Sequence, residues 1–298
     1  MSKPTLWVLV GLSGSGKSTI ATQIANDNPN TIIVSSDTIR KELTGSRSDQ
    51  SQNEEVFKIF HDRIRRALEH KKNVVADATN LTMRSRRAIM MKVRGLDIYK
   101  VCYIIPKPFE QCKSDNLNRE HPVPEEVLDK QLRRFQIPFY EEGFEQIDIK
   151  PFEKENPLTM LDMFNLMKNF EQKNPHHNKT LDKHCEHTQE LFSEYCHWNV
   201  YNFGAMLHDF GKLYTQTIDE NGMAHYYDHS SVGSYLVLEN LVSYCINENI
   251  SLAICFLINY HMMPFGWDSY KSKERWRSRF GDAKYQMLLD FNKCDRTR

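Results

Sequence analysis

The sequence has no long hydrophobic run, no internal repeat and no low-complexity tract. Its first apolar stretch, TLWVLVG, is too short to span a membrane and leads into a glycine-rich loop without the cleavage pattern of a signal peptide. The 7 cysteines are odd in number and include no C-x-x-C pair, which argues against a disulfide framework. We therefore expect a soluble, cytoplasmic protein with reduced thiols and no membrane contact.

The chain also lacks net charge, since its 39 lysine and arginine residues balance its 39 aspartate and glutamate residues. The charge is not evenly distributed, because residues 1–150 carry 24 basic and 20 acidic side chains and residues 151–298 carry 15 and 19. Between Arg63 and Arg94, ten basic residues are opposed by only two acidic ones. Such a stripe suits a polyanion, although solvated helix faces often have the same composition.

The pattern of hydrophobic residues divides the chain near residue 150. Residues 1–150 alternate between short apolar strands and amphipathic helices, which predicts a parallel sheet covered by helices. Beyond the proline-containing stretch PFEKENPLT, residues 151–298 show helical periodicity. Nine of the 12 histidines lie between His176 and His261. We predict an α/β domain over the first range and an all-α, metal-binding domain over the second.

A glycine-rich loop, GLSGSGKS, spans residues 11–18 and matches the pattern G-x-x-x-x-G-K-[ST]. A predicted strand precedes it and a predicted helix follows it. Its backbone N–H groups and Lys17 can therefore surround nucleotide phosphates, and Ser18 can offer its hydroxyl to Mg²⁺. We expect ATP, or another nucleoside triphosphate, and Mg²⁺ to bind at Gly11, Ser13, Gly14, Ser15, Gly16, Lys17, Ser18 and Thr19.

Polar side chains also follow the next two predicted strands. Asp37 ends the segment TIIVSSD and could accept the proton of an attacking hydroxyl, while Arg40, one helical turn later, could hold an acceptor phosphate. The same two residues could equally be a helix-capping aspartate and its i,i+3 ion pair. Asp77, Thr79 and Asn80 follow the third strand, and the ends of parallel strands meet at one edge of a sheet.

Residues 113–134 are expected to form a mobile lid over this edge. Within the lid, Arg119 is the candidate for bridging the charge of the transferring phosphoryl group. Arg133 and Arg134 are weaker candidates, because either could be a solvated helix residue. Phosphoryl transfer depends mainly on positioning and charge neutralisation, which these basic groups can supply.

The combination of GLSGSGKS, D-x-x-R, DATN, N-x-x-R and VPEEVL resembles the 5′-OH polynucleotide kinase domain of bacteriophage-type end-healing enzymes, over roughly the first 150 residues. This resemblance implies that Asp37 is the general base for the 5′-OH, that Arg40 holds the acceptor 3′-phosphate and that Arg119 is the lid arginine. Relatives often carry a further arginine just before the lid asparagine, where this chain has Asp115. Similar loops occur in small-molecule kinases, so this domain alone leaves the acceptor open.

The second half contains residues suited to holding a metal. His208 and Asp209 are adjacent in an apolar segment, where an ionised aspartate needs a compensating charge. Imidazole and carboxylate groups from several helices can hold divalent transition metals with open positions for water and phosphate. A bound metal lowers the pKa of its water to about 7 in favourable cases.

The order His…His-Asp…His…His…Asp, with the motif H-D-x-G-K, resembles the HD phosphohydrolase superfamily over about residues 175–298. The resemblance implies two metal sites for Mn²⁺, Ni²⁺, Co²⁺ or a similar ion. Their ligands would be His187, His208, Asp209 and Asp295 for one site, with His229 and His261 completing the other. Lys212 would meet a substrate phosphate oxygen. Asp290 competes with Asp295 for the last ligand position.

Single histidines are more often structural residues than ligands. We expect this of His176, His177, His184, His197 and His225. The segment YKSKERWRSRF, residues 270–280, interleaves five basic residues with three aromatic ones. It could contact nucleic acid, with Trp276 stacking on a base, or be a solvated loop with one core aromatic.

A kinase and a phosphohydrolase are compatible in one chain if they act on opposite ends of a broken strand. We predict a bifunctional enzyme that phosphorylates 5′-OH ends and removes 3′-phosphate or 2′,3′-cyclic phosphate from RNA or DNA, after which a separate ligase acts. Two alternatives stay open at this point. One is a small-molecule or nucleoside kinase fused to an HD nucleotidase, and the other is a nucleotide-gated sensor.

Overall fold

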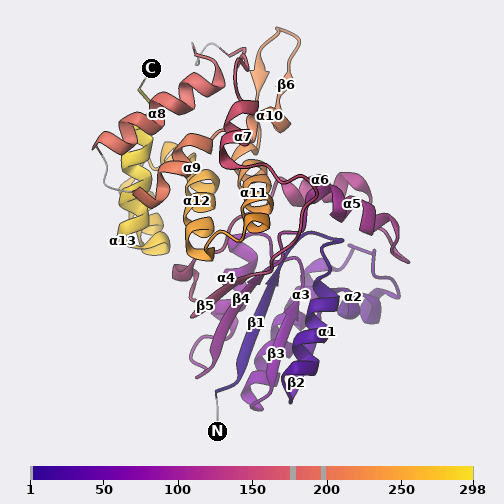
Figure 1. The fold of residues 1–298 in the computed structure, drawn as a ribbon. Helices are drawn as coiled ribbons and strands as arrows, with labels where there is room; N and C mark the ends of the chain where they lie inside the picture. Colours follow the sequence, from indigo (N-terminus) through magenta and orange to yellow (C-terminus); the bar gives the residue numbers. More distant parts are fainter. Residues whose placement is uncertain (1–2, 175–178, 196–198, 298) are drawn as a thin grey trace. The chain divides into compact units, whose positions relative to one another are not determined.

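A computed structural model describes residues 3–174, 179–195 and 199–297 of the chain (Figure 1). The chain forms two compact units. The first unit comprises Met1–Gln131 and Pro138–Phe152, and the second comprises Leu132–Ile137 and Glu153–Arg298. The short segment Leu132–Ile137 therefore packs with the second unit, although it precedes the proline-containing stretch that marks the predicted boundary.

The first unit is built on a five-stranded parallel sheet with the strand order β2-β3-β1-β4-β5. The strands are β1 (Thr5–Val10), β2 (Thr31–Ser35), β3 (Asn73–Asp77), β4 (Tyr99–Ile104) and β5 (Gln146–Ile149). Strand β1 is central, with Val8 in register with Ala76 of β3 and with Cys102 of β4. All three side chains are fully buried. The predicted parallel sheet flanked by helices is confirmed.

Helices connect the strands of this sheet. They are α1 (Lys17–Asp27), α2 (Ser36–Thr44), α3 (Asn53–Glu69), α4 (Met83–Lys92), α5 (Phe109–Leu117), α6 (Glu125–Leu132) and the 3₁₀ helix η1 (Tyr140–Glu142). Helix α3 shows why they form, because Val56, Phe60, Ile64 and Leu68 recur every four residues and all are buried. That apolar stripe faces the protein, while most of the remaining residues of the helix are polar or charged.

One member of the basic stripe between Arg63 and Arg94 is not at the surface. Arg86 is fully buried and donates two hydrogen bonds to the carboxylate of Glu142, at 2.8 and 2.6 Å. It also donates to the backbone carbonyls of Asn80 and Leu81. Arg86 therefore ties the loop after β3 to η1, and the expectation of a continuous surface stripe is corrected at this residue.

The second unit is mainly helical. Its helices are α7 (Met160–Leu166), α8 (Leu181–Tyr195), α9 (Asn202–Leu207), α10 (Lys212–Thr215), α11 (His229–Leu241), α12 (Glu248–Tyr260) and α13 (Tyr270–Asp295), with the 3₁₀ helices η2 (Asn199–Tyr201), η3 (Val242–Tyr244) and η4 (Met263–Gly266). Helices α11 and α12 pack together, and Ile254, Phe256 and Ile258 of α12 are buried.

Three local features of this unit differ from the sequence expectation. A short antiparallel pair, β6 (Thr217–Ile218) and β7 (Ala224–His225), replaces purely helical structure, because the side chain of Asp219 accepts two backbone hydrogen bonds in the connecting turn. The apolar segment NFGAMLHDFGKLY, residues 202–214, does not form one helix but breaks into α9 and α10. Helix α13 extends back over 270–280, with a kink at Gly281, where φ is 74°.

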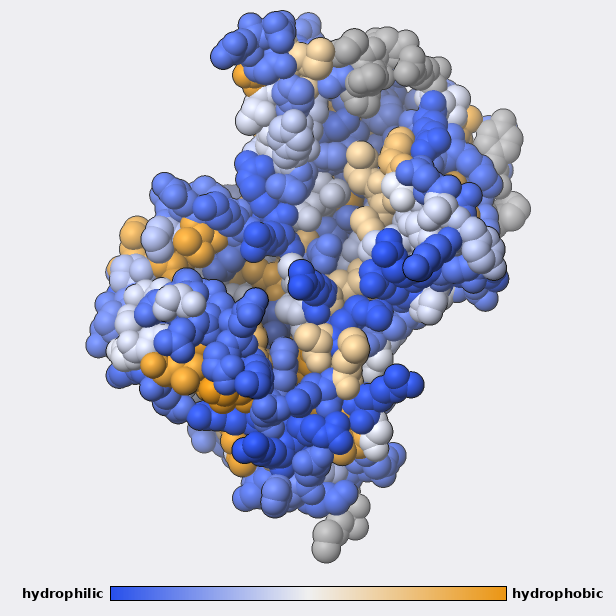
Figure 2. All heavy atoms as spheres, turned by 180° about the vertical axis from the view of Figure 1, so that it is seen from behind, coloured by the Kyte–Doolittle hydropathy of each residue, from blue (hydrophilic) through white to orange (hydrophobic). Residues whose placement is uncertain are grey.

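None of the helices in the described ranges is long and apolar enough to cross a membrane. On the face drawn in Figure 2, hydrophilic residues predominate and hydrophobic residues form only small groups.

Candidate functional site

The glycine-rich loop of the first unit connects β1 to α1. Gly14 and Gly16 have φ values of 81° and 89°, in the left-handed region that glycine adopts readily. A Cβ atom on Gly14 would lie 2.2 Å from the carbonyl oxygen of Cys112, so a side chain cannot fit there. The hydroxyl of Ser15 is buried and has no hydrogen-bond partner among the described residues. These features fit a loop whose polar groups are completed by a bound anion.

Three side chains in and near the loop, those of Lys17, Ser18 and Asp77, are suited to binding nucleotide phosphates and a metal ion. The ammonium group of Lys17 donates to the carbonyl of Leu12 at 2.7 Å, and the hydroxyl of Ser18 donates to Asp77 at 3.0 Å. Burial lowers the pKa of Lys17 and raises the pKa of Asp77. Ser18 and Asp77 are oxygen ligands of the kind that Mg²⁺ prefers. The sequence placed Asp77 at the sheet edge but gave it no role. Asp77 ends β3, which pairs with β1, and the loop after β1 leads to Ser18, so the sheet brings the two side chains together.

The two candidate acceptor residues are in direct contact. Arg40 donates to Asp37 at 2.8 Å and to the side chain of Asn53 at 3.2 Å. The Arg40 side chain is buried, whereas that of Asp37 is 49% exposed. The i,i+3 ion pair of the structural interpretation is therefore present. Burial dominates the lowering of the Lys17 pKa and the rise of the Asp77 pKa; the negative charge of Asp37 partly opposes the first shift and adds to the second.

The predicted lid region contains α5, α6 and the loop between them. The side chain of Asn116 brackets this loop, because it donates to the carbonyl of Val123 at 2.8 Å and accepts from its N–H at 3.0 Å. Arg119 lies exposed within the bracketed loop, and its charge contributes to lowering the pKa of Lys17. From α6, Gln131 accepts from the backbone N–H of Ser13 at 2.8 Å and donates to its hydroxyl at 3.0 Å.

Arg133 does not belong to this region. It packs with the second unit, where it donates to the carbonyl of Tyr227 at 3.0 Å, and Arg134 also falls in that unit. The proposal of these two residues as lid arginines is therefore corrected. Gln131, which sequence reasoning missed, is the residue of α6 that reaches the glycine-rich loop.

The second unit brings four histidine and two aspartate side chains together. These residues, the histidine–aspartate cluster, are His184 on α8, His208 and Asp209 after α9, His229 at the start of α11, His261 after α12 and Asp295 at the end of α13. They come from five separate helices or helix ends. The break between α9 and α10 places His208 and Asp209 at the centre of the cluster. All six side chains are at most 11% exposed.

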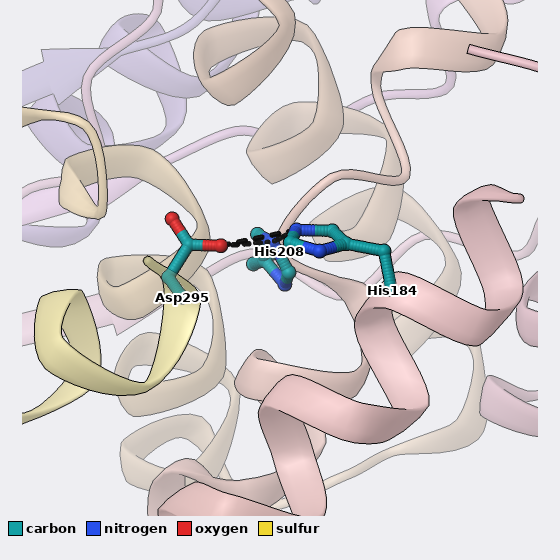
Figure 3. Close-up of side chains that lie close together, drawn as sticks. All are labelled: His184, His208 and Asp295. Carbon is teal, nitrogen blue, oxygen red and sulfur yellow. Dashed lines mark hydrogen bonds and ion pairs between the residues drawn. The ribbon is translucent and has the colours of Figure 1, made fainter. Parts of the chain in front are cut away.

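The cluster contains two groups that share Asp209. In the first group, Nε2 of His184 lies 3.3 Å from Nε2 of His208, and Oδ1 of Asp295 lies 3.0 and 3.3 Å from these two nitrogens (Figure 3). Asp209 turns Oδ2 toward this group, 3.3 Å from His208. Its other oxygen, Oδ1, lies 3.1 Å from His229 in the second group. One carboxylate therefore faces both groups.

The second group consists of His229, His261 and the Oδ1 atom of Asp209. The Nε2 atoms of the two histidines are 3.2 Å apart. His261 is fully buried and its Nε2 lies 3.6 Å from Oδ1. Burial lowers the pKa of His261, which favours the neutral imidazole that binds metals.

Backbone hydrogen bonds determine which ring nitrogens can bind a cation. In His208, His229 and His261, Nδ1 lies 2.8 Å from the carbonyl oxygen three residues earlier in the chain. A carbonyl can only accept, so each Nδ1 carries hydrogen, and Nε2 presents a lone pair to the cluster whenever the ring is neutral. Metal-ligating histidines typically have this arrangement.

The spacing of the donors fits divalent metal ions. Two nitrogens bound to one ion at about 2.0–2.1 Å are about 2.8–3.0 Å apart at an octahedral angle and about 3.3–3.4 Å apart at a tetrahedral angle. The Nε2 separations within the two groups are 3.3 and 3.2 Å. Imidazole and carboxylate together suit Mn, Fe, Co, Ni or Zn. The residues present therefore fit two divalent metal ions, one held by each group.

The charges of the cluster also call for a cation. Burial alone would raise the pKa of Asp209, but the Lys212 ammonium and the His208 imidazole hold it well below its usual range. Burial would likewise raise the pKa of Asp295, but His208 and the hydrogen bond with His184 lower it. Burial opposes protonation of His208, but the surrounding anionic groups outweigh it and raise its pKa well above the usual value. The ionised carboxylates of Asp209 and Asp295 therefore favour a cation in the centre of the unit.

Lys212 lies behind Asp209. Its ammonium group is 2.6 Å from Oδ2 of Asp209 and 2.8 Å from Oε1 of Gln172, and it sits 5.3 Å from the centre of the Tyr226 ring. The residue is only 4% exposed. These contacts orient Asp209. Whether Lys212 also meets a substrate phosphate, as the HD resemblance implies, stays a prediction.

A glycine of the H-D-x-G-K motif has a packing role. A Cβ atom on Gly211 would lie 2.0 Å from the carbonyl oxygen of His229 and 2.7 Å from the backbone nitrogen of Gly233. Helix α11, which carries His229, can therefore approach the break after α9 only because residue 211 has no side chain. A glycine two residues after Asp209 is therefore needed for His229 to come close to His208 and Asp209.

The histidine expected on α8 is replaced by its neighbour. His187 is half-buried and belongs to none of the metal-competent groups of the described chain, whereas His184, expected to be structural, belongs to one. The two lie three residues apart on one helix, so helical periodicity could not distinguish them. Cys185, also missed, lies beside His208 and Asp209.

The remaining candidates of the second half are placed as follows. Asp295 joins the cluster, while Asp290 instead pairs with Gln286 and Lys293. His225 pairs with Asp219 on the β6–β7 hairpin. His176, His177 and His197 lie outside the described residues.

Comparison with known proteins defines the first unit. Residues 6–138 match the model of the AAA domain family. Over 137 residues the chain is 28% identical to L-seryl-tRNA(Sec) kinase of Methanococcus maripaludis, an alignment that covers 45% of this chain and 53% of the relative. The chain thus spans about half the length of the curated relative it matches.

Solved structures similar to the chain include a chain of the Pnkp1/Rnl/Hen1 RNA repair complex, at 26% identity and a TM-score of 0.42, covering 53% of this chain and 52% of that one. A fungal RNA kinase is similar at 18% identity and a TM-score of 0.40, covering 57% and 45%. A gluconokinase from Sinorhizobium meliloti is similar at 21% identity and a TM-score of 0.36, covering 50% and 83%.

Proposed function

We propose that the protein is a bifunctional nucleic-acid end-healing enzyme. The AAA domain would phosphorylate 5′-OH ends with ATP, and the second unit would remove 3′-phosphate or 2′,3′-cyclic phosphate, in the manner of HD phosphohydrolases. The observation that carries this proposal is the histidine–aspartate cluster, whose Nε2 atoms converge on one bridging carboxylate in a chain that also has a complete nucleotide loop. A separate ligase would then seal the healed ends.

In the kinase reaction, the loop N–H groups and Lys17 would hold the β- and γ-phosphates of ATP. Ser18 and Asp77 would hold Mg²⁺. The 5′ oxygen would form a bond to the γ-phosphorus as the bond from that phosphorus to the leaving oxygen of ADP breaks, and Asp37 would accept the hydroxyl proton. The half-exposed Asp37 is accessible for this, while the buried Arg40 orients it. Arg119 would neutralise charge on the transferring group.

The identity of the acceptor is supported by the sequence relative. That relative is named as a kinase of seryl-tRNA(Sec), so its substrate is an RNA-borne molecule. The motifs shared with polynucleotide kinases point to the 5′-OH of a strand as the acceptor hydroxyl in this chain.

In the second unit, His184, His208, Asp209 and Asp295 would hold one metal ion, and Asp209, His229 and His261 the other. Bound metal ions would activate a water molecule and neutralise phosphate oxygens. Lys212 would keep Asp209 ionised and oriented between the two groups. Hydrolysis would replace the bond between phosphorus and the 3′ oxygen of the strand with a bond to the water oxygen, leaving a 3′-OH.

The proposal is tested with one oligonucleotide that carries a 5′-OH and a 3′-phosphate, prepared as matched RNA and DNA. Purified protein with ATP, Mg²⁺ and Mn²⁺ or Ni²⁺ should add phosphate to the 5′ end and release it from the 3′ end. A parallel substrate with a 2′,3′-cyclic end tests the phosphodiesterase step. The proposal would be contradicted if the protein performed neither reaction on the RNA or on the DNA.

A second candidate is a small-molecule or nucleoside kinase joined to an HD nucleotidase. The burial of Arg40 favours this candidate. Its guanidinium already donates hydrogen bonds to Asp37 and Asn53, and a buried group of this kind would be reached more easily by a small acceptor than by a strand. This candidate predicts that phosphorylation is lost when the acceptor is longer than one nucleotide. End healing predicts that longer acceptors are used as well or better.

A further inference from the structure

An exposed aromatic ring and an exposed arginine lie beside the histidine–aspartate cluster. The guanidinium carbon of Arg296 is 4.6 Å from the centre of the Phe265 ring, a cation–π contact. Phe265 is 40% exposed, and Arg296 is exposed as well. We refer to these two residues as the Phe265–Arg296 pair.

The chain connects this pair directly to two cluster residues. Arg296 follows Asp295 immediately, and Phe265 lies in η4, which begins two residues after His261. Helix α13, which carries Asp295, packs against η4. Both cluster residues contact His208, since Asp295 lies 3.3 Å from its Nε2 and the His261 ring centre lies 5.1 Å from its own. The pair therefore lies next to the cluster.

Core packing does not account for the exposure of Phe265. Other phenylalanines of the same unit, such as Phe256, Phe280 and Phe291, are at most 1% exposed. The neighbouring Trp267 is also buried, stacked on Tyr285. An aromatic ring that stays 40% exposed beside a polar cluster presents apolar surface to whatever enters it.

We propose that the Phe265–Arg296 pair is a subsite for the nucleobase of the terminal nucleotide whose phosphate enters the cluster. This inference rests on the proposed phosphohydrolase function. Every nucleobase has a π face that stacks on an aromatic ring or a guanidinium plane, so such a subsite holds the end of a strand without selecting its sequence. Only one ribose separates the base from its own 3′-phosphate, which suits a stacking surface adjacent to the cluster. The charge of Arg296 also suits the polyanionic strand.

Two other aromatic residues of this unit are less suited to the role. Trp276, expected to stack on a base, is stacked on Phe280 with ring centres 5.3 Å apart, and Arg279 lies 4.8 Å from its ring. Tyr227 is exposed but is stacked on His225, at an interplanar angle of 3°. Phe265 is the one of these three whose ring is paired with a cation adjacent to a cluster residue.

The test uses a short RNA whose 3′-terminal, 3′-phosphorylated nucleotide carries 2-aminopurine, a base whose fluorescence is quenched by stacking. Binding to the full-length protein in EDTA is measured by this quenching, which does not depend on turnover. Phosphate release from the RNA and from glycerol 2-phosphate, which has no base, is then measured with Mn²⁺. Wild type, Phe265→Leu, Phe265→Trp, Arg296→Gln and the matched control Phe203→Leu, whose ring is 47% exposed on α9, are compared.

We expect Phe265→Leu and Arg296→Gln to weaken RNA binding and kcat/KM for the RNA by about tenfold and to lose quenching. Phe265→Trp should restore both, Phe203→Leu should behave as wild type, and release from glycerol 2-phosphate should be unchanged throughout. Equal quenching and equal kcat/KM in wild type and Phe265→Leu would overturn the inference. A loss that is equally large with glycerol 2-phosphate would overturn it too. If wild type released no phosphate from either substrate, the proposed function would fail, while quenching would still decide the subsite.

Discussion

The Nε2 atoms of His229 and His261 lie 3.2 Å apart, while Nδ1 of each ring donates to a backbone carbonyl at 2.8 Å. Two neutral imidazoles held this way direct lone pairs at each other. Such an arrangement is unfavourable unless a cation lies between the two nitrogens. The backbone contacts of these two rings therefore orient their Nε2 atoms as a bound divalent metal would require.

Metal content tests this arrangement. We expect the wild-type protein to bind two divalent ions per chain, because Asp209 presents one oxygen to each of the two groups. His184→Gln should lose one ion, since Nε2 of His184 lies in the first group. Native mass spectrometry and elemental analysis after loading with Mn²⁺ or Ni²⁺ give the stoichiometry.

The control for this experiment lies on the same helix. His187→Gln should keep both ions, because His187 contributes to none of the metal-competent groups within the described residues. If His187→Gln lost an ion and His184→Gln kept both, the arrangement of α8 around the cluster would be wrong.

Replacing Gly211 should damage both folding and metal binding. The added methyl group of Gly211→Ala would lie 2.0 Å from a backbone oxygen of α11, and backbone atoms cannot move aside easily. Overpacking typically costs about 1–3 kcal/mol, and we expect at least the upper value in urea unfolding of the second unit. Gly266→Ala is the control, because no atom lies within 4 Å of its added Cβ and the change should stay within about 0.5 kcal/mol. Equal stability of the two variants would contradict this packing.

Asp37→Asn separates the catalytic from the structural interpretation of the Asp37–Arg40 contact. A general base predicts that kcat for 5′ phosphorylation falls by about 10²–10⁴-fold while ATP affinity is unchanged. A purely structural ion pair predicts lower thermal stability with kcat retained. The exposed Asp27→Asn serves as the control and should change neither quantity.

Nucleotide binding should be linked to proton uptake at alkaline pH. Burial lowers the pKa of Lys17 in the nucleotide-free protein, and the bound phosphates would raise it. Between these two pKa values the free lysine is partly neutral and the bound lysine is charged, so binding takes up a proton. Calorimetry at about pH 9 in buffers of different ionisation enthalpy measures this uptake. Lys17→Arg should abolish the uptake because arginine does not titrate in this range, whereas proton release by wild type would contradict the account.

The sequence predicted most of the first unit because its signals are local. The apolar strands, the glycine-rich loop and the amphipathic α3 each follow from short-range patterns that the buried sheet preserves. Asp77 could be placed at the sheet edge but not on Ser18, since that contact depends on β1 and β3 being neighbours. Arg86 could not be recognised as buried, because its partner Glu142 lies 56 residues away.

In the second unit the order of residues predicted the kind of site but not its full membership. His208 and Asp209 were found because they are adjacent in an apolar segment, whereas His229 and His261 were assigned by the resemblance to HD phosphohydrolases. The choice of His184 over His187 depends on the rotation of α8, which periodicity leaves undetermined. The short β6–β7 hairpin depends on turn contacts of Asp219 that a helical pattern does not show.

The most direct test of two independent phosphate sites compares Lys17→Ala and Asp209→Ala on one oligonucleotide labelled at both ends. Lys17→Ala should abolish 5′ phosphorylation and leave 3′-phosphate release within about twofold of wild type, because Lys17 belongs only to the first unit. Asp209→Ala should abolish phosphate release and leave 5′ phosphorylation largely intact. Loss of both reactions in either folded variant, or retention of phosphate release in Asp209→Ala, would contradict the account.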